Sequence, residues 1–547
     1  MYKLKIMGKE YTYDTPRTLE SIKDELNIKD AYCVRLNTRV KELKYVISSD
    51  CDVEFLGLNN SETTIMYRNT LRYIIYMALH SINKELCFEC NFSVSRGLYF
   101  GIKGAKKPIT YNFLAVLKQK VDEIIKANYD IKRVTVTKEE AIKIYEELGY
   151  TDKIELLKYR PDKTVHLYEC NGYYNYMFGY MLPKTSYVKE YQMRLYSPGI
   201  IVLYPRSDSD GKIPRFEDDK VFAETLRKAN KWGQISKASS ITEINKIIEN
   251  DKDVELINLC ETKHNNMLAE LGEEIQKDIE NIRLIAIAGP SSSGKTTFCN
   301  RLRIELLSRG ISPIMISIDD YYLPKNEAPR DENGDLDLEH IEALDIDLFN
   351  KDMYSLINGE EVTLPHFDFE QGKRVPGKTY KIDENTPIII EGIHALNDRL
   401  TASIPSNQTF KIYIAPHVQL QIDNQNPISM TDIRLIRRIV RDKQFRNCPC
   451  EDTLKMWPSV RRGEFRWIYP NQAHANYVYN SELTYELCVL KKYALSQLQE
   501  VKEDSEYYTV ANRLVKFLKH FKDIDDEWIP CNSLLREFIG KSSFYKK

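Results

Sequence analysis

The 547-residue chain is too long for a single hydrophobic core, and at roughly 150 residues per domain it predicts three or four domains. Apolar residues make up 42% and charged residues 29%, which is the balance of an ordinary globular protein. With 78 basic against 80 acidic residues, the net charge of -2 gives no argument for a nucleic-acid or membrane partner.

The amino terminus and the cysteines favour a cytoplasmic protein. The opening stretch MYKLKIMGKEYTYD lacks the apolar run of a signal peptide, and no window approaches the roughly eighteen apolar residues of a membrane span. The eleven cysteines are an odd number without framework spacing, so we expect reduced thiols. Cys87 with Cys90, and Cys448 with Cys450, lack a second ligand pair at zinc spacing, so no zinc site is predicted.

Residues 1–59 predict a small α+β unit. The alternating runs YKLKIM, EYTYD and DVEFLGL flank the helical stretch TPRTLESIKDELNI. Thr15 is the expected N-cap of this helix and Pro16 its first residue. The polar stretch NNSET ends the unit.

Residues 60–206 predict a second mixed unit, and residues 207–281 a helical linker. MYRNTLRYIIYMALHSIN has helical periodicity, and the unit closes at IIVLYPRSDSDGKIPR, where Pro, Gly, Ser and Asp cluster. In the linker, TKHNNMLAELGEEIQKDIENI reads as an amphipathic helix with a solvated face.

Residues 282–499 predict a domain built on a parallel sheet. The apolar runs RLIAIAG, SPIMISID, TPIIIEG and TFKIYIA alternate with helical stretches, as in sheets that helices cover on both faces. Residues 500–547 form a helical tail that we expect to pack on this domain. The fold class expected for the whole chain is multi-domain α/β.

The stretch GPSSSGKT in this domain has the spacing GxxxxGK[ST] of a phosphate-binding loop. Its glycines let backbone N–H groups converge on phosphate oxygens, while Lys295 neutralises the β- and γ-phosphates and the Thr296 hydroxyl ligates Mg²⁺. A strand ends directly at the loop, and a helix closed by Gly310 follows it. The predicted ATP contacts in the loop are Gly289, Pro290, Ser291, Ser292, Ser293, Gly294, Lys295, Thr296 and Thr297.

Carboxylates follow two other strands of the predicted sheet. SPIMISIDDYY delivers Asp319 and Asp320 to the carboxyl edge, where open α/β sheets bind ligands. One of them can accept a proton from a substrate hydroxyl and hold a water on Mg²⁺, and an Asx turn is the structural alternative. Glu391 ends TPIIIEG at the same edge and is a candidate for a role beside the metal.

The order GPSSSGKT, SIDDYY, LPHFDF, IIIEGIHAL and IRRIVRD resembles the uridine kinase and phosphoribulokinase branch of P-loop kinases, over about residues 282–490. The resemblance implies ATP as phosphoryl donor, Mg²⁺, and a small hydroxylated acceptor, typically the 5′-hydroxyl of a nucleoside. It places Asp319 at the catalytic base, beside Lys295, and Thr296 with Asp319 and Glu391 around the metal.

The stretch DIRLIRRIVRDKQFR resembles the arginine-bearing lid helix of that family. Arg438 and Arg441 hold positions that meet the phosphates, and Arg438 also the acceptor, when the lid closes. By spacing alone, Arg434, Arg438 and Arg441 share one helix face and can converge on a common anion, with a solvated basic face as the alternative. Weaker candidates are Arg446, Arg461 and Arg462, and the Arg- and Trp-rich segment 457–470 receives no role.

The acceptor pocket departs from the pattern of uridine kinases. LEHIEALD offers Glu339 where they carry an aspartate for the ribose hydroxyls, and LPHFDFEQGKR offers Phe367 and Gly372 where they carry a tyrosine and a histidine. A carboxylate and an aromatic ring are kept, whereas a hydroxyl and an imidazole donor are lost. Because a missing hydrogen-bonding group changes discrimination by orders of magnitude, pyrimidine specificity does not transfer.

Residues 1–59 resemble the β-grasp TGS domain of threonyl-tRNA synthetases, and residues 60–206 are similar to their editing domain. That domain carries HxxxH and a later Cys and His, whereas this chain has Tyr73, Met77, Met177 and Met181. These side chains pack but cannot activate water, so no editing hydrolysis is expected. Binding of RNA or of a small regulatory ligand, regulation of the kinase and homo-oligomerisation stay open as roles.

The sequence therefore predicts an ATP-dependent nucleoside kinase of uridine-kinase type. Two alternatives stay open. One is an NTP-driven RNA-binding or regulatory protein, and the other is a phosphoribulokinase-like kinase of sugar phosphates, which needs cationic side chains facing the acceptor phosphate.

Overall fold

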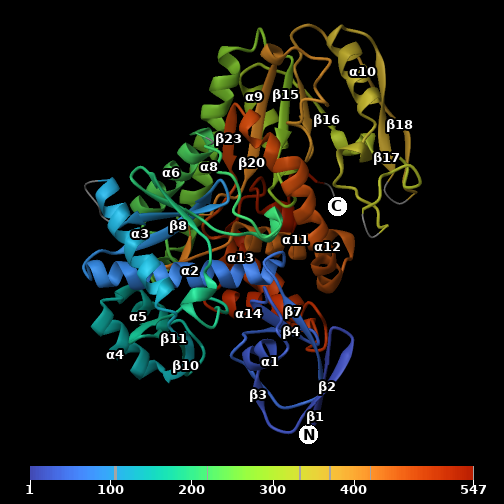
Figure 1. The fold of residues 1–547 in the computed structure, drawn as a ribbon. Coiled ribbons are helices and arrows are strands. Elements are labelled where there is room, and N and C mark those ends of the chain that lie inside the picture. Colours follow the sequence, from blue (N-terminus) through green and yellow to red (C-terminus); the bar gives the residue numbers. More distant parts are fainter. Residues whose placement is uncertain (104–107, 219, 332–333, 369–370, 419, 546–547) are drawn as a thin grey trace.

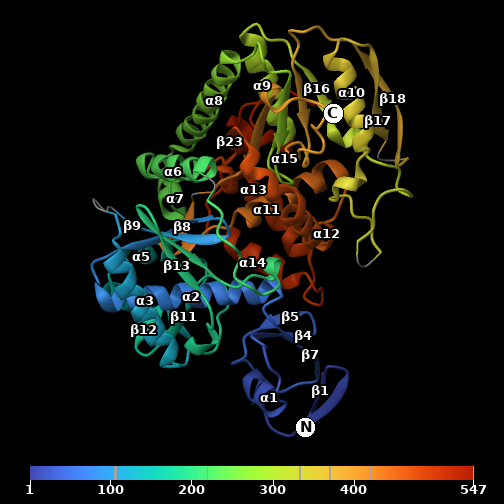
Figure 2. The same ribbon diagram turned by 45° about the horizontal axis from the view of Figure 1, so that its top comes forward.

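The computed structural model describes residues 1–103, 108–218, 220–331, 334–368, 371–418 and 420–545. The amino-terminal unit lies at the bottom of the molecule and a parallel sheet at the top (Figure 1), and the rotated view keeps this order (Figure 2). All eleven cysteines are free thiols. None of the helices in the described part of the chain combines the length and apolar character needed to span a bilayer.

The first unit is a five-stranded sheet in the order β2-β1-β7-β4-β5, with one helix packed on it. Its helix begins later than expected, because Arg17 and Thr18 pair with Ile47 and Val46 as a short strand. Thr18 instead of Thr15 is therefore the N-cap, and its hydroxyl accepts from the Ser21 N–H at 3.2 Å. The elements are β1 (Tyr2–Ile6), β2 (Lys9–Tyr13), β3 (Arg17–Thr18), α1 (Leu19–Glu25), β4 (Cys33–Leu36), β5 (Arg39–Lys41), β6 (Val46–Ile47) and β7 (Cys51–Leu56).

The second unit is arranged around a long buried helix, α2 (Ser61–Ile82), which lies across the middle of the molecule in Figure 1. Two antiparallel sheets accompany it, in the orders β13-β14-β9-β8 and β10-β11-β12. The other elements are β8 (Phe88–Val94), β9 (Gly97–Ile102), α3 (Tyr111–Lys126), β10 (Lys132–Thr137), α4 (Lys138–Leu148), α5 (Thr151–Leu157), β11 (Thr164–Cys170), β12 (Tyr173–Asn175), β13 (Gln192–Tyr196) and β14 (Gly199–Leu203).

The four residues at the positions of the lost editing ligands are core residues. Tyr73, Met77, Met177 and Met181 are all buried in one hydrophobic cluster. The Tyr73 hydroxyl donates to the Tyr173 carbonyl at 2.6 Å, so its only polar atom is satisfied by the backbone. This part of the second unit is packed as an interior.

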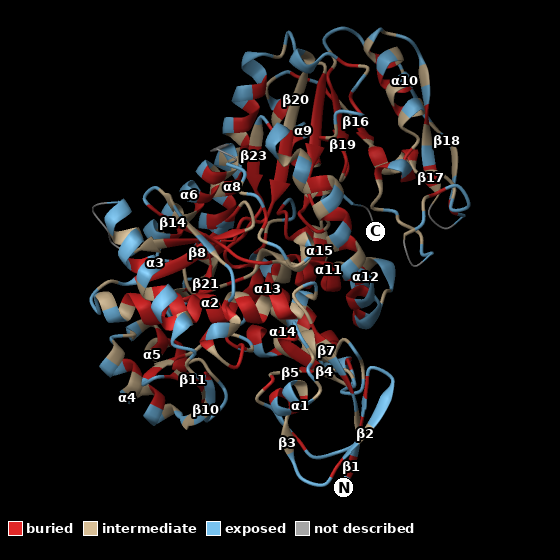
Figure 3. Cartoon of the chain, in the orientation of Figure 1, coloured by how far each residue is buried: buried red, intermediate tan, exposed pale blue. Residues whose placement is uncertain are grey.

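Three helices lead to the parallel sheet: α6 (Lys220–Ile235), α7 (Ile241–Glu249) and α8 (Asp253–Lys277). As predicted, α8 is amphipathic, since Leu268, Leu271 and Ile275 are buried while most of its polar side chains face solvent, Glu261 and His264 being buried (Figure 3). Its buried face packs along the helix that follows the phosphate loop.

The parallel sheet has the order β16-β19-β15-β20-β23, with every neighbouring pair parallel. Its strands are β15 (Leu284–Ala288), β16 (Ile314–Ser317), β19 (Ile388–Glu391), β20 (Thr409–Ala415) and β23 (Tyr477–Asn480). Ile285 joins the core that contains Phe298 of α9 (Lys295–Ser308), whereas Ala286 joins the core that contains Phe349 of α10 (Ile346–Ile357). Helices therefore cover both faces, as predicted, and β23 is an additional strand that the apolar runs did not predict.

Further elements frame the carboxyl edge of the sheet. A hairpin stands beside α10, two helices lie between β20 and β23 in the chain, and three helices of the described residues follow β23. These elements are β17 (Val362–Asp368), β18 (Lys373–Tyr380), β21 (Gln421–Asp423), β22 (Asn426–Pro427), α11 (Met430–Arg446), α12 (Cys450–Gly463), α13 (Glu486–Glu500), α14 (Tyr508–Leu518) and α15 (Arg536–Ile539). The tail helices pack as expected, α14 on α13 and α15 on α11, while the five domain ranges drawn from the sequence stay predictions.

Candidate active site

The phosphate loop joins β15 to α9, and two of its glycines are required by shape. A Cβ on Gly289 would clash with the carbonyl oxygen of Ile414 on the neighbouring strand β20. Gly294 has φ +91°, a left-handed conformation that side chains disfavour. The loop therefore turns closely enough to present the first backbone N–H groups of α9 to an anion.

The side chains of Lys295 and Thr296 at the start of α9 differ in their contacts. Lys295 turns back over the loop, where its Nζ donates to the carbonyls of Gly289 (2.9 Å) and Pro290 (3.3 Å). Thr296 is half-buried, and no described residue hydrogen-bonds to its hydroxyl. Thr297 is buried, and its N–H donates to Oε2 of Glu537 at 3.0 Å.

The paired aspartates after β16 are separated by their contacts. Asp320 Oδ1 accepts from the Phe367 N–H at 3.1 Å and lies 2.9 Å from His366 Nδ1, so it fastens the β17 strand to this edge. No described residue hydrogen-bonds to the carboxylate of Asp319. Burial raises the pKa of Asp319, Lys295 lowers it, and Asp320 raises it further. Of the two aspartates, Asp319 is therefore the one whose carboxylate has no hydrogen bond from the described residues.

Glu391 lies at the end of β19, at the same level of the sheet. It pairs in register with Ser317, two residues before Asp319, and with Ile287 of β15. Burial, and then the Asp319 carboxylate, raise the pKa of Glu391 to about 7 against the pull of Lys295. The strands of the sheet bring the two acids to one point beside the lysine.

Thr296, Asp319 and Glu391 offer the donor chemistry that Mg²⁺ prefers. Hydroxyl and carboxylate oxygens are hard ligands. The negative charges of Asp319 and Glu391 repel each other, and a divalent cation between them would relieve this repulsion. The described residues form no group of three or more acidic, His or Cys side chains that could hold a metal ion.

Glu339 approaches this edge from the segment before α10. Its side chain packs on Gly463 of α12, where a Cβ would clash with it. Burial and the nearby Glu464 raise the pKa of Glu339 to about 7, while Arg438 and Lys295 lower it. Its Oε2 is buried and has no hydrogen-bond partner among the described residues. The structure therefore places a carboxylate with one unused oxygen where the charges of Lys295 and Arg438 act on it.

Phe367 and Gly372 belong to the β17–β18 hairpin. Phe367 is buried, and its ring meets that of Tyr322 edge-on at 5.8 Å between centroids. Gly372 has φ +65° and lies against the side chain of Lys325. Residues 369 and 370 of the expected pocket segment lie outside the described residues.

The arginines of α11 divide into two groups, contrary to the expectation that Arg434, Arg438 and Arg441 converge on one anion. Arg434 is fully buried, forms an ion pair with Glu464, and donates through Nε to the Ser291 carbonyl at 2.9 Å. The hydrogen bond to Ser291 lets Arg434 support the phosphate loop. The ion pair with Glu464 supplies the counter-charge that a buried guanidinium needs.

Arg438 and Arg441 do share an anion, and that anion is Asp442. Arg438 Nε and Arg441 Nη2 lie 3.2 and 2.8 Å from its carboxylate oxygens, and Arg446 lies 3.6 Å away. Arg438 Nη1 also donates to the Ser291 hydroxyl at 2.8 Å. The charge of Asp442, to which the sequence motifs assign no role, holds these arginines at the loop.

The segment 457–470, which had no role from the sequence, supplies the counter-charge for Arg434. Glu464 is fully buried and pairs with Arg461 as well as Arg434, and the Tyr469 hydroxyl donates to it at 3.2 Å. The only signal in the sequence is the i,i+3 spacing of Arg461 and Glu464.

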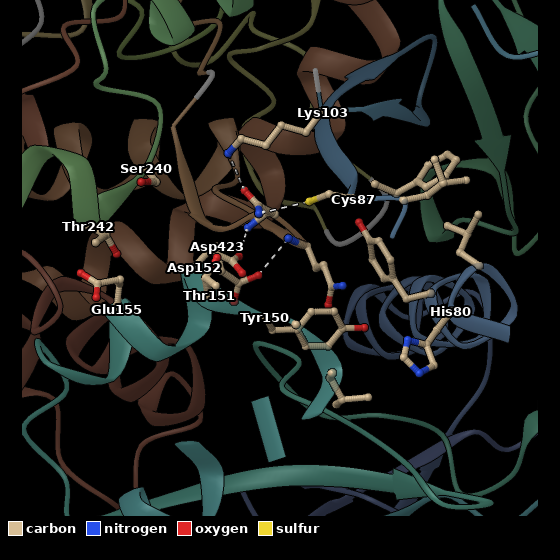
Figure 4. Close-up of a pocket in the computed structure, with 18 of the residues that line it drawn as sticks. His80, Cys87, Lys103, Tyr150, Thr151, Asp152, Glu155, Ser240, Thr242 and Asp423 are labelled. Atoms are coloured by element: carbon tan, nitrogen blue, oxygen red, sulfur yellow. Dashed lines mark hydrogen bonds between the residues drawn. The ribbon is translucent and has the colours of Figure 1, made fainter. Parts of the chain in front are cut away.

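A separate cavity of about 450 Å³ lies between the second unit and the β21–β22 hairpin (Figure 4). His80 of α2 lies on one side of it, and Glu155 and Thr242 on the other. Two of its lysines form ion pairs, Lys246 with Glu155 at 2.7 Å and Lys103 with Glu89 at 3.2 Å. The cavity is distinct from the edge of the parallel sheet.

Comparison with known proteins divides the chain in the same way. Residues 284–484 match the model of the Phosphoribulokinase / Uridine kinase family. The amino-terminal half is similar to threonine–tRNA ligases. The ligase of Thermotoga petrophila is 30% identical over 190 residues, 34% of this chain and 29% of that enzyme, and that of Anoxybacillus flavithermus is 28% identical over 186 residues, 34% and 28%. The chain thus matches less than a third of the length of these ligases.

Two solved structures also align with the chain. One is provisionally assigned as a fructose transport system kinase of Silicibacter sp. TM1040, with 18% identity over 39% of this chain and 98% of that one, at a TM-score of 0.28. The other is provisionally assigned as a uridine kinase of Bacillus stearothermophilus, with 19% identity over 36% and 89%, at a TM-score of 0.25. At these scores the alignments add nothing to the geometry above.

Proposed function

We propose that this chain, whose residues 284–484 are a kinase domain of the phosphoribulokinase / uridine kinase family, transfers the terminal phosphoryl group of ATP to the 5′-hydroxyl of a nucleoside. The observation that carries the proposal is the pairing of a phosphate-binding loop with a carboxylate, Asp319, to which no described residue hydrogen-bonds. Asp320 beside it already accepts the Phe367 N–H through Oδ1, which makes Asp319 the better candidate for this role.

In the proposed reaction, Asp319 accepts the proton of the acceptor hydroxyl as its oxygen attacks phosphorus. Lys295 leaves the carbonyls of Gly289 and Pro290 and neutralises charge on the transferring phosphoryl group. Arg438 and Arg441 add positive charge from α11. Thr296, Asp319 and Glu391 would hold Mg²⁺, which supplies further charge neutralisation on the phosphates.

Glu339 supports a ribose-bearing acceptor. A carboxylate with an unused buried oxygen suits the vicinal hydroxyls of a ribose, which donate two hydrogen bonds in parallel. Phe367, whose ring meets that of Tyr322 edge-on, supplies an aromatic side chain on the β17–β18 hairpin. A sugar phosphate is the second acceptor class, because Arg446 is more than half exposed and its positive charge lowers the pKa of Asp319.

The test is an ATP-consumption assay on the full chain with nucleosides, sugar phosphates or RNA added. Asp319→Asn is expected to lower turnover by about 10²- to 10⁴-fold with ATP binding nearly unchanged, because it removes the base and leaves the loop intact. Asp320→Asn is the matched control, since its amide oxygen can still accept the Phe367 N–H. Unchanged turnover of Asp319→Asn, or hydrolysis that RNA stimulates and nucleosides leave untouched, contradicts the proposal.

A further inference from the structure

The last described residues of the chain lie on the phosphate loop. Leu534, Leu535 and Phe538 are fully buried in the core that also holds α9. Leu534 packs directly on the loop, where a Cβ on Gly294 would clash with it. Residues 533–539 are therefore anchored in the interior beside the loop.

Two side chains from this region contact the start of α9. Glu537 Oε2 accepts the Thr297 N–H at 3.0 Å, and the Tyr545 hydroxyl lies 3.4 Å from the Thr297 hydroxyl. Thr297 is the third residue of α9, so its N–H has no partner within the helix. The negative charge of Glu537 also acts on Glu391, which places it close to the acids of the site.

A carboxylate at this N–H stands where the loop binds anions. The N–H groups that begin a helix after a phosphate loop are the donors that phosphate oxygens use. One N–H donates a full hydrogen bond to one acceptor, and a phosphate beside the Glu537 carboxylate is repelled by it. The two anions therefore exclude each other at Thr297.

We propose that Glu537 and Tyr545 compete with ATP for the phosphate loop, with the Glu537 carboxylate in the position of a phosphate oxygen. This inference rests on the proposed function, since it takes ATP as the ligand of the loop. The displaced part is small, because Glu537 is half-buried and Tyr545 exposed while Leu534 and Phe538 stay in the core. ATP has only to rotate one side chain and release residues 541–545.

Such competition lowers the apparent affinity for ATP by the fraction of molecules in which the loop is free. The hydrogen bond between the charged Glu537 and the Thr297 N–H stabilises the form of the protein in which the loop is blocked. Removing the charge weakens this form, so we expect the Kd for ATP to fall about tenfold. Tyr545→Phe removes only a long contact between two hydroxyls, so we expect a smaller decrease.

The experiment measures the Kd for ATP by calorimetry on the full chain, for the wild type, Glu537→Gln, Tyr545→Phe and Glu527→Gln. Glu527 is an exposed carboxylate of the same tail and serves as the matched control. The thermal unfolding midpoint of each variant shows whether it is folded. In parallel, hydrogen exchange of residues 541–545 is followed with and without a non-hydrolysable ATP analogue.

Competition predicts tighter ATP binding by Glu537→Gln, no change for Glu527→Gln, and faster exchange of residues 541–545 when the analogue is bound. Equal or weaker ATP binding by a folded Glu537→Gln variant, or slower exchange of these residues, overturns the competition and leaves the kinase proposal standing. Absence of ATP binding by the wild type and all variants overturns the proposed function as well.

Discussion

Replacing Glu464 with glutamine removes a buried negative charge and keeps the shape of the side chain. Glu464 and Arg434 are both fully buried and form an ion pair, and Arg461 and the Tyr469 hydroxyl complete the cluster. Although burial opposes ionisation, Arg434 and Arg461 hold the pKa of Glu464 below its ordinary value. The Glu464 carboxylate is therefore ionised at neutral pH. Replacing it with a neutral amide leaves the charge of Arg434 in the interior without its main counter-charge.

We expect Glu464→Gln to lower the free energy of unfolding by about 3 kcal/mol, near the lower end for breaking a buried ion pair, because the amide oxygen still accepts a hydrogen bond. Arg434 Nε also supports the Ser291 carbonyl, so the KM for ATP rises in the same variant. Urea unfolding and steady-state kinetics measure the two effects.

The matched control is Glu224→Gln, which breaks the exposed 3.1 Å pair of Glu224 with Lys228. We expect it to change the free energy of unfolding by about 0.5 kcal/mol or less. Combining Glu464→Gln with Arg434→Met removes both buried charges and is expected to recover part of the loss. A loss for Glu464→Gln no larger than that of Glu224→Gln refutes the reasoning.

Two further predictions concern the acceptor and the metal. Gly463→Ala is expected to lower kcat/KM for the acceptor by up to about a hundredfold with the KM for ATP unchanged, because the new methyl displaces Glu339, and an unchanged kcat/KM contradicts the placing of Glu339. The Mg²⁺ concentration for half-maximal activity is expected to rise about tenfold per unit as pH falls below 7, because the pKa of Glu391 is about 7 and only its ionised form binds the metal. Glu391→Gln flattens this dependence, and a requirement for Mg²⁺ that is equal on both sides of pH 7 in the wild type argues against Glu391 as a ligand.

Much of the fold could be predicted from local pattern. The apolar runs at 284–288, 314–317, 388–391 and 409–415 are strands of the parallel sheet, and the helices of the linker and tail were expected. Two errors share one cause. Thr18 instead of Thr15 caps α1 because residues 17–18 pair with residues 46–47, and β23 is a strand because it lies beside β20. Pairing with distant residues decides such short segments, and local propensity does not record it.

By itself, the sequence of this protein determined which side chains reach the carboxyl edge of the sheet. Its motifs place Lys295 after β15, Asp319 after β16 and Glu391 at the end of β19. Only the tertiary structure decided what each of them can do. Asp320 accepts a hydrogen bond from β17, and Arg434 forms an ion pair with Glu464. The Thr297 N–H donates to Glu537, which is 240 residues away in the chain. Hydrogen bonds and ion pairs act over a few ångströms in space, and that distance is set by packing and not by position along the chain.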